Sequence, residues 1–139
     1  MKSSFIIRLV LVSLLISLLS SPAFSDVAII VHPDNEITLD DKSIARIFLV
    51  KTKKFPNGNE AVPVDNQEIK AQFDKEILKK SKSQLDSYWA KQVFTGKATP
   101  PTIVPNTDKV KELVASDPKV IGYIDAASVD DTVKVIFRF

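Results

Sequence analysis

The chain has 139 residues, with 19 basic and 17 acidic side chains and a formal net charge of +2, and it contains no cysteine. The lack of cysteine excludes disulfides, thiol catalysis and thiolate metal sites. So small a net charge, without a long basic run, is not typical of a nucleic-acid-binding protein.

The first 25 residues have the pattern of a signal peptide. Two basic residues, Lys2 and Arg8, precede an uncharged apolar stretch, and small residues follow it up to Ser25. This is the order of charged region, apolar region and cleavage site in export signals. Pro22 interrupts the apolar stretch before it reaches the roughly 20 residues of a membrane span. We therefore predict a signal peptide over residues 1–25 that is removed by cleavage.

Cleavage there changes the charge balance and sets the expected location. The signal peptide takes two basic residues with it, so the 19 basic side chains fall to 17 and match the 17 acidic ones. Residues 26–139 are enough for one domain with its own core. We expect this domain to be periplasmic, to bind no nucleic acid and to have no stable membrane insertion.

Strand and helix patterns alternate along residues 26–139. Short apolar runs and alternating apolar positions predict strands, whereas apolar residues spaced three or four apart predict helices. The predicted strands cover residues 26–31, 61–64, 102–104, 120–124 and 133–139. The predicted helices have their apolar stripes within residues 44–48, 69–77, 85–93 and 110–114. The alternation predicts an α/β domain with a mixed sheet of about five strands and about four flanking helices.

Two local patterns refine this prediction. Asp65 and Glu68 stand three residues apart before the second helix, a spacing that predicts Asp65 as the cap of the helix N-terminus. In residues 133–139 every second side chain is apolar, which predicts a strand with one apolar face. Trp89 follows the helical spacing and is expected in the core.

Residue patterns of catalysis and metal binding are sparse. His32 is the only histidine, so it lacks companions for a transition-metal site. The chain has only three glycines, too few for a glycine-rich phosphate loop, and no serine lies in a G-x-S-x-G motif. We therefore expect a non-enzymatic protein without a metal or cofactor.

Short motifs follow one another in a recognisable order over nearly all of residues 26–139. They are Ile47-Phe48-Leu49, Pro56-Asn57-Gly58, Pro63-Val64, Phe73, Tyr88-Trp89, Asn106 and Ile121-Gly122-Tyr123. Their order and spacing resemble the phosphate-type substrate-binding proteins of ABC transporters. The resemblance implies the type II periplasmic binding protein fold, in which two lobes clamp a ligand by rigid rotation. This chain looks like a short member with a single lobe.

A ligand in such a sheet should lie at the carboxyl ends of the strands. The candidate ligand-binding residues are Asn35, Asp65, Asn66, Gln67, Asn106 and Thr107. The family usually holds its anion with a Ser-Gly-Thr turn and an arginine, but residues 64–72 read VDNQEIKAQ and contain none of these. Asp65 and Glu68 would place two negative charges where phosphate would sit. Val50 stands where the family often has glycine.

Two functions are compatible with this pattern. The first is a solute-binding protein for a small oxyanion or another small ligand, with a homodimer or partner supplying the wall that one lobe lacks. The alternative is an accessory module that meets another envelope protein and binds no small molecule.

Overall fold

The computed structural model describes residues 26–139. Residues 1–25, and with them the predicted signal peptide, lie outside the described residues. Within the described part, no helix combines the length and the hydropathy needed to cross a membrane.

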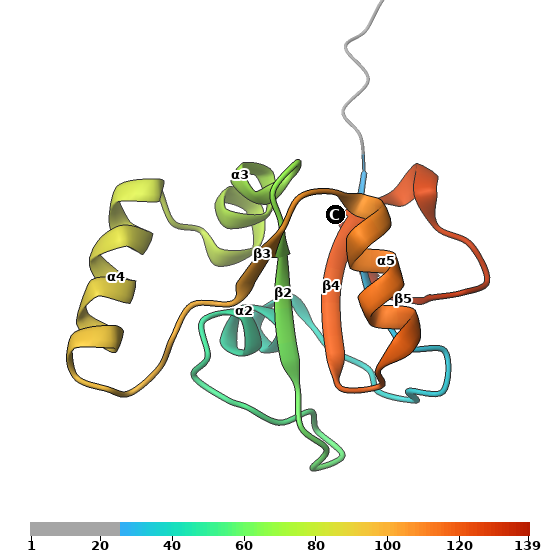
Figure 1. Ribbon diagram of the computed structural model, residues 1–139, viewed down its shortest axis with the longest axis horizontal. Coiled ribbons are helices and arrows are strands. Elements are labelled where there is room, and N and C mark those ends of the chain that lie inside the picture. The colour runs from blue at the N-terminus through green and yellow to red at the C-terminus, as the bar shows by residue number, and fades with distance from the viewer. Residues whose placement is uncertain (1–25) are drawn as a thin grey trace, which may run out of the picture.

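Five strands form one mixed sheet, as predicted. The strands are β1 (Val27–Val31), β2 (Val62–Asn66), β3 (Thr102–Val104), β4 (Val120–Asp125) and β5 (Lys134–Arg138). They lie in the order β3-β2-β4-β1-β5 (Figure 1). β2 pairs in parallel with β3 and β4, whereas β1 pairs antiparallel with β4 and β5. The central strands β1 and β4 are buried on both faces, which explains their continuous apolar runs.

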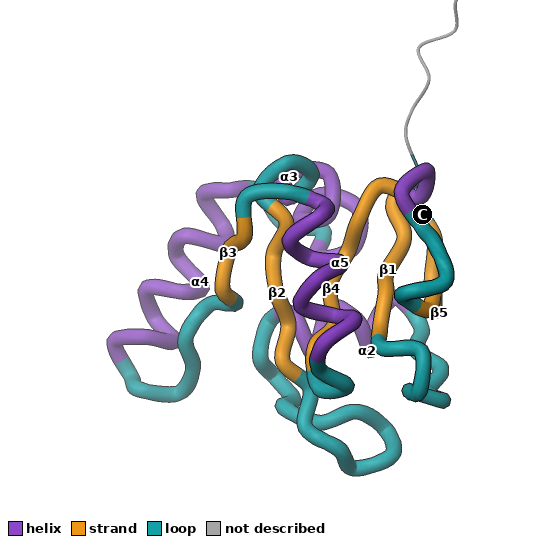
Figure 2. The backbone as a smooth tube through the Cα atoms, turned by 45° about the vertical axis from the view of Figure 1, so that its right-hand side comes forward, coloured by secondary structure: helices purple, strands orange, loops and turns teal. Residues whose placement is uncertain are grey.

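Four helical segments flank this sheet, also as predicted. They are α2 (Asp41–Phe48), α3 (Lys70–Phe73) with its π-helical continuation η2 (Asp74–Leu78), α4 (Lys82–Phe94) and α5 (Thr107–Ser116). A short 3₁₀ turn, η3 (Ala126–Ser128), follows β4. α5 lies on one face of the sheet and α2 on the other, while α4 stands to one side, beyond β3 (Figures 1 and 2).

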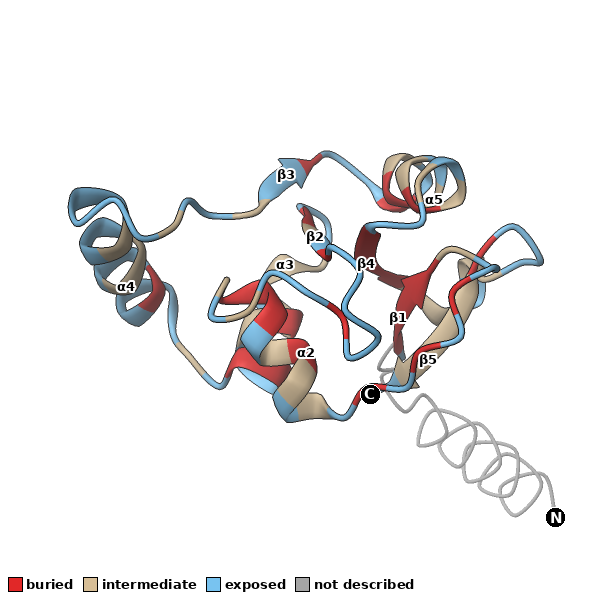
Figure 3. Ribbon diagram, turned by 90° about the horizontal axis from the view of Figure 1, so that it is seen from below, coloured by how far each residue is buried: buried red, intermediate tan, exposed pale blue. Residues whose placement is uncertain are grey.

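The pleat of the strands divides the core into two layers. Ile29 and Tyr123 belong to the layer that contains α2, α3 and η2, where Phe73 stacks on Tyr123 with ring centroids 4.0 Å apart. Ile30 and Ile124 point the other way and pack with Val110 and the rest of α5. Figure 3 shows the buried strands between these layers, and an α4 that is largely half-buried or exposed.

The expectation of one apolar face on the last strand is wrong. Ile29 pairs with Phe137 and Ile30 with Val135, so Ile136 is an extra residue in β5. Such a bulge shifts the alternation of side chains by one position. Val135 therefore packs on the α5 layer, whereas Phe137 packs on the α2 layer.

The end of α2 places Val50 in a strained conformation. The N–H of Lys51 donates to the carbonyl of Arg46 and the N–H of Val50 to that of Ile47, a Schellman arrangement that needs a left-handed residue at Val50. Val50 has φ of 53°, which a β-branched side chain disfavours.

Val50→Gly is therefore expected to stabilise the protein by about 1 kcal/mol, because the relief of left-handed strain exceeds the entropy that glycine adds to the unfolded chain. Urea denaturation measures the change. Val50→Ala is the matched control, since it also shortens the side chain but keeps the Cβ, and it should gain less. A Val50→Gly variant clearly less stable than Val50→Ala would show that left-handed strain at this position is negligible, because only the entropy of glycine would then separate the two.

Candidate ligand site at the carboxyl edge of the sheet

The parallel strands bring four of the six predicted residues to one edge. Because β2, β3 and β4 run in the same direction, their carboxyl ends meet. Asn66 ends β2 and Gln67 follows it, whereas Asn106 and Thr107 come shortly after β3. Asp125 ends β4 at the same edge.

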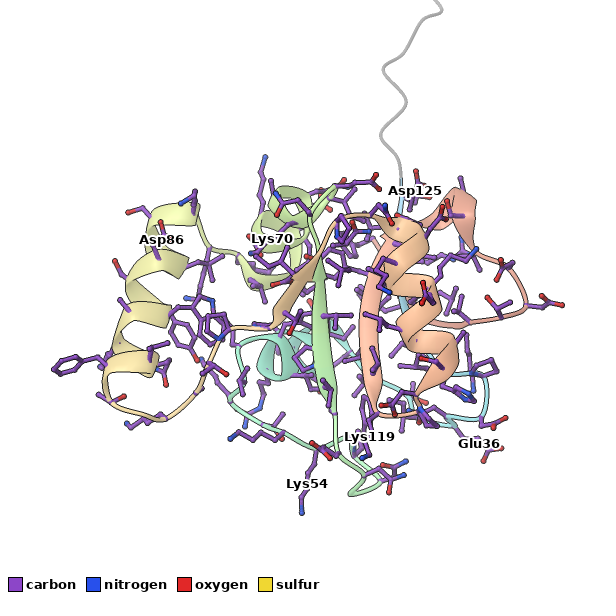
Figure 4. All side chains as sticks on the ribbon, in the orientation of Figure 1. Glu36, Lys54, Lys70, Asp86, Lys119 and Asp125 are labelled. Atoms are coloured by element: carbon purple, nitrogen blue, oxygen red, sulfur yellow. The ribbon has the colours of Figure 1, made fainter. Side chains whose placement is uncertain are left out.

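Asn35 lies at the opposite edge, and its expected place beside the other candidates is wrong. β1 runs antiparallel to β4, so the segment after β1 meets the start of β4. The side-chain amide of Asn35 accordingly donates to the carbonyl of Pro118 at 3.4 Å. Figure 4 shows the neighbouring Glu36 at the end of the sheet away from Asp125.

Asn66 is the buried centre of the edge. Its Nδ2 donates to the hydroxyl of Thr107 at 3.1 Å and to the carbonyl of Tyr123 at 3.2 Å. Its Oδ1 accepts from the N–H of Glu68 at 3.1 Å. Asn66 therefore joins β2, β4 and the N-terminus of α5, and both Asn66 and Thr107 are buried.

The carboxylate of Glu68 occupies the N-terminus of α5. Its Oε2 accepts a hydrogen bond from the N–H of Thr107, the first residue of the helix, at 3.2 Å. Asn106 caps the same helix through the N–H of Lys109 at 2.9 Å. Helix N-termini favour negative charge because their N–H groups are unpaired and the helix dipole is positive there. The structure thus places a carboxylate of its own chain against the first N–H of α5.

Asp65 lies on the other face of β2 and is not a helix cap. The prediction of a cap is wrong, because β2 continues to Asn66 and the helix that follows has no side-chain cap. The Oδ1 of Asp65 accepts from the hydroxyl of Tyr123 at 2.9 Å, and Lys70 Nζ lies 4.0 Å from its other oxygen. Of the two negative charges expected at the ligand position, only that of Glu68 is there.

Burial controls the ionisation of this pair. Loss of hydration raises the pKa of Asp65 to about 6, against the opposing effects of Lys70 and of the Tyr123 hydrogen bond. Burial, and then the nearby Asp65 carboxylate, raise the pKa of Tyr123, so its hydroxyl stays protonated and donates. Lys70 also binds Asp74 at 2.7 Å, and the second oxygen of Asp74 is buried without a hydrogen-bond partner among residues 26–139.

Sequence reasoning missed the role of Glu68 across the sheet edge and the bond between Tyr123 and Asp65. Both connect residues far apart in sequence, and the spacing of Asp65 and Glu68 suggested a local cap instead. Asn106 did carry a readable signal, because asparagine directly before an apolar helical stripe is a common N-cap.

The comparisons with known proteins bear on the fold. No protein-family model and no curated protein matches the sequence. Among solved structures, an ABC-type phosphate transport receptor from Vibrio cholerae is similar, with 19% identity, a TM-score of 0.57 and coverage of 82% of this chain and 46% of that one. A Clostridium perfringens protein with bound phosphate, assigned as a phosphate ABC transporter substrate-binding protein, has 22% identity and a TM-score of 0.54, with coverage of 81% and 45%.

The fold is that of one lobe of a periplasmic binding protein. The expected fold is therefore confirmed. The chain spans less than half the length of the two solved structures, both named for transport rather than catalysis. Within residues 26–139, no group of three or more His, Cys, Asp or Glu side chains is placed to hold a metal ion.

Proposed function

We propose that residues 26–139 form an exported, non-enzymatic periplasmic binding protein that takes up a small oxyanion where Asn66, Glu68 and Thr107 meet. The observation that carries this proposal is the Glu68 carboxylate bound to the N–H of Thr107. A helix N–H that already donates to a carboxylate can donate in the same way to another oxyanion. The bound phosphate in a solved structure of similar fold supports the choice of anion.

Glu68 acts in this proposal as an internal competitor. Glu68 is exposed, so its side chain can leave the helix N-terminus without disturbing the core. An incoming anion then accepts a hydrogen bond from the N–H of Thr107 and contacts the exposed Gln67 and Asn106 beside it. While Glu68 stays in place, its negative charge opposes anion entry. A single lobe offers a shallow site, so a second copy or a partner supplies the opposite wall.

The test is calorimetric titration of residues 26–139 with phosphate, for the wild type and Glu68→Ala. We expect the variant to bind phosphate at least roughly tenfold more tightly than the wild type, because it loses both the competitor and the repulsion. Glu36→Ala is the matched control: it removes the same charge at the opposite edge of the sheet and should leave phosphate binding unchanged (Figure 4).

The three possible outcomes of these titrations distinguish an anion site from an effect of charge. Phosphate heat that increases only in Glu68→Ala supports an anion site at α5. No heat in either protein at millimolar phosphate contradicts it, and an equal gain in both variants would indicate an effect of net charge alone.

A further inference from the structure

A wide groove runs beside α4, which itself packs on the core through the buried Leu85. Its volume is about 1250 Å³, and η2, α4 and β3 form its walls. The apolar side chains that line it include Leu85, Trp89 and Val93 from α4 and Ile103 from β3. Trp89 packs against the core, as expected, but it is only half-buried and also lines this groove.

Apolar side chains remain exposed on and beside the groove. Val93 is 53% exposed and Ile103 51% exposed. Phe94, the last residue of α4, is 92% exposed. Isolated exposed apolar residues are ordinary, but a group of them around a depression marks an interaction site.

The charge of the groove is positive. Its acidic residues are all engaged within the protein: Asp65 and Asp74 by Lys70, and Asp86 by Lys82. This leaves three lysines of the lining without an ion pair among residues 26–139, and these are Lys75, Lys79 and Lys80. An apolar floor beside unpaired cations is complementary to a partner with an apolar stripe and acidic flanks.

Two other occupants fit these features less well. Small-molecule sites bury most of their ligand, whereas Val93 and Ile103 leave this groove open to solvent. A second copy of the chain would bring the same lysines to a shared two-fold interface, where like charges repel. An amphipathic helix laid alongside α4 covers the apolar floor and pairs with the lysines, which is a known mode of recognition.

We infer that the groove between α4, η2 and β3 is a docking site for an acidic amphipathic helix of a partner protein. This inference goes beyond the anion site proposed at the sheet edge. A negative result for the groove would not contradict the anion site, and the reverse also holds, because the two are tested with different ligands and different variants.

The experiment uses the fluorescence of Trp89, which is the only tryptophan in the chain. The probe is a synthetic helical peptide of about 14 residues, long enough to run alongside α4, with leucines on one face and glutamates on the other. A matched peptide carries lysine in place of each glutamate. We expect the acidic peptide alone to shift the emission of Trp89 in a saturable way, with affinity that falls as salt rises.

Variants of the protein locate the contact. The double variant Lys79→Glu with Lys80→Glu reverses two charges of the groove and should lower the affinity for the acidic peptide by roughly tenfold or more. Ile103→Ser should also weaken the binding of the acidic peptide, and the loss should persist at high salt because it concerns an apolar contact. The matched control reverses two exposed charges outside the groove, in Lys53→Glu with Lys54→Glu, and should leave the affinity unchanged. Circular dichroism of each variant establishes that it is folded.

Three results would overturn the inference. One is an unchanged emission of Trp89 with the acidic peptide up to about 1 mM. Another is equal binding of the acidic and the basic peptide. The third is a concentration-dependent dimer in sedimentation that Ile103→Ser dissociates, because the groove would then serve a second copy.

Discussion

Gly122→Ala is expected to destabilise the protein by about 2–3 kcal/mol, because β4 and α5 approach too closely there for a side chain. A Cβ at position 122 would lie 2.5 Å from Cγ1 of Val110 and 3.2 Å from Cγ2 of Val64. Val110 is fully buried, so its methyl group has no free space to enter. Urea denaturation of the wild type and the variant, with unchanged m-value, measures the loss.

A double-mutant cycle with Val110→Ala identifies the cause. Val110→Ala alone should destabilise the core by leaving a cavity. Combined with Gly122→Ala, it removes the methyl group that the new Cβ would strike, so the double variant should be more stable than the two single losses predict. Strict additivity would mean that Gly122 is required for some reason other than the contact with α5.

The same position shows why motifs predicted this fold well. Gly122 and Tyr123 are adjacent in β4 and face opposite layers. The lack of a side chain at Gly122 lets α5 pack closely on the strand, and the hydroxyl of Tyr123 donates to Asp65 on the other face. Each residue satisfies a local steric or polar requirement that the short motif records. Periodicity located the strands and helices for a similar reason, since the burial of each element repeats along its own sequence.

Strand direction was beyond local patterns. β1 precedes α2 and β2, so it resembles the first strand of a parallel unit, yet β4 lies between β1 and β2 in the sheet. Nothing within residues 26–31 indicates that β1 pairs antiparallel with β4. The placement of Asn35 failed for this reason, whereas the residues after β2 and β3 were correctly grouped.

The start of the second helix was misplaced because two interactions compete for Asp65. As a cap it would satisfy one backbone N–H, but as part of β2 it extends the pairing with β3 and bonds to Tyr123. The predicted strand ended at residue 64, and the observed strand ends at Asn66. These two residues move Asp65 from a solvated loop into a buried face, so that of the two expected carboxylates only that of Glu68 meets the N-terminus of α5.

Asp65→Asn is expected to stabilise the protein at pH 7 and to lose this advantage near pH 4. The pKa of Asp65 is about 6 in the folded protein and lies near 3.8 in an unconstrained chain. The folded state therefore binds the proton more tightly than the unfolded state, and stability falls as pH rises between these values. About two pKa units correspond to about 3 kcal/mol. Below pH 4 the carboxyl is protonated in both states, and the cost of ionising it disappears.

Urea denaturation at pH 4, 5, 6 and 7 should show the difference between Asp65→Asn and the wild type growing by about 3 kcal/mol over this range. Asparagine keeps an oxygen that accepts from the Tyr123 hydroxyl, so the comparison isolates the charge. A difference that stays constant from pH 4 to pH 7 would show that Asp65 is not desolvated in the folded protein.

Tyr123→Phe separates desolvation from hydrogen bonding at the same site. The hydroxyl of Tyr123 stabilises the ionised carboxylate, so its removal should raise the pKa of Asp65 further and extend the loss of stability to higher pH. The variant also leaves a buried acceptor without its donor, which costs about 1–3 kcal/mol when Asp65 is charged. Protonation lessens this cost, so the destabilisation by Tyr123→Phe should be smaller at pH 4 than at pH 7. Equal destabilisation at both pH values would assign the effect of the hydroxyl to packing rather than to the charge of Asp65.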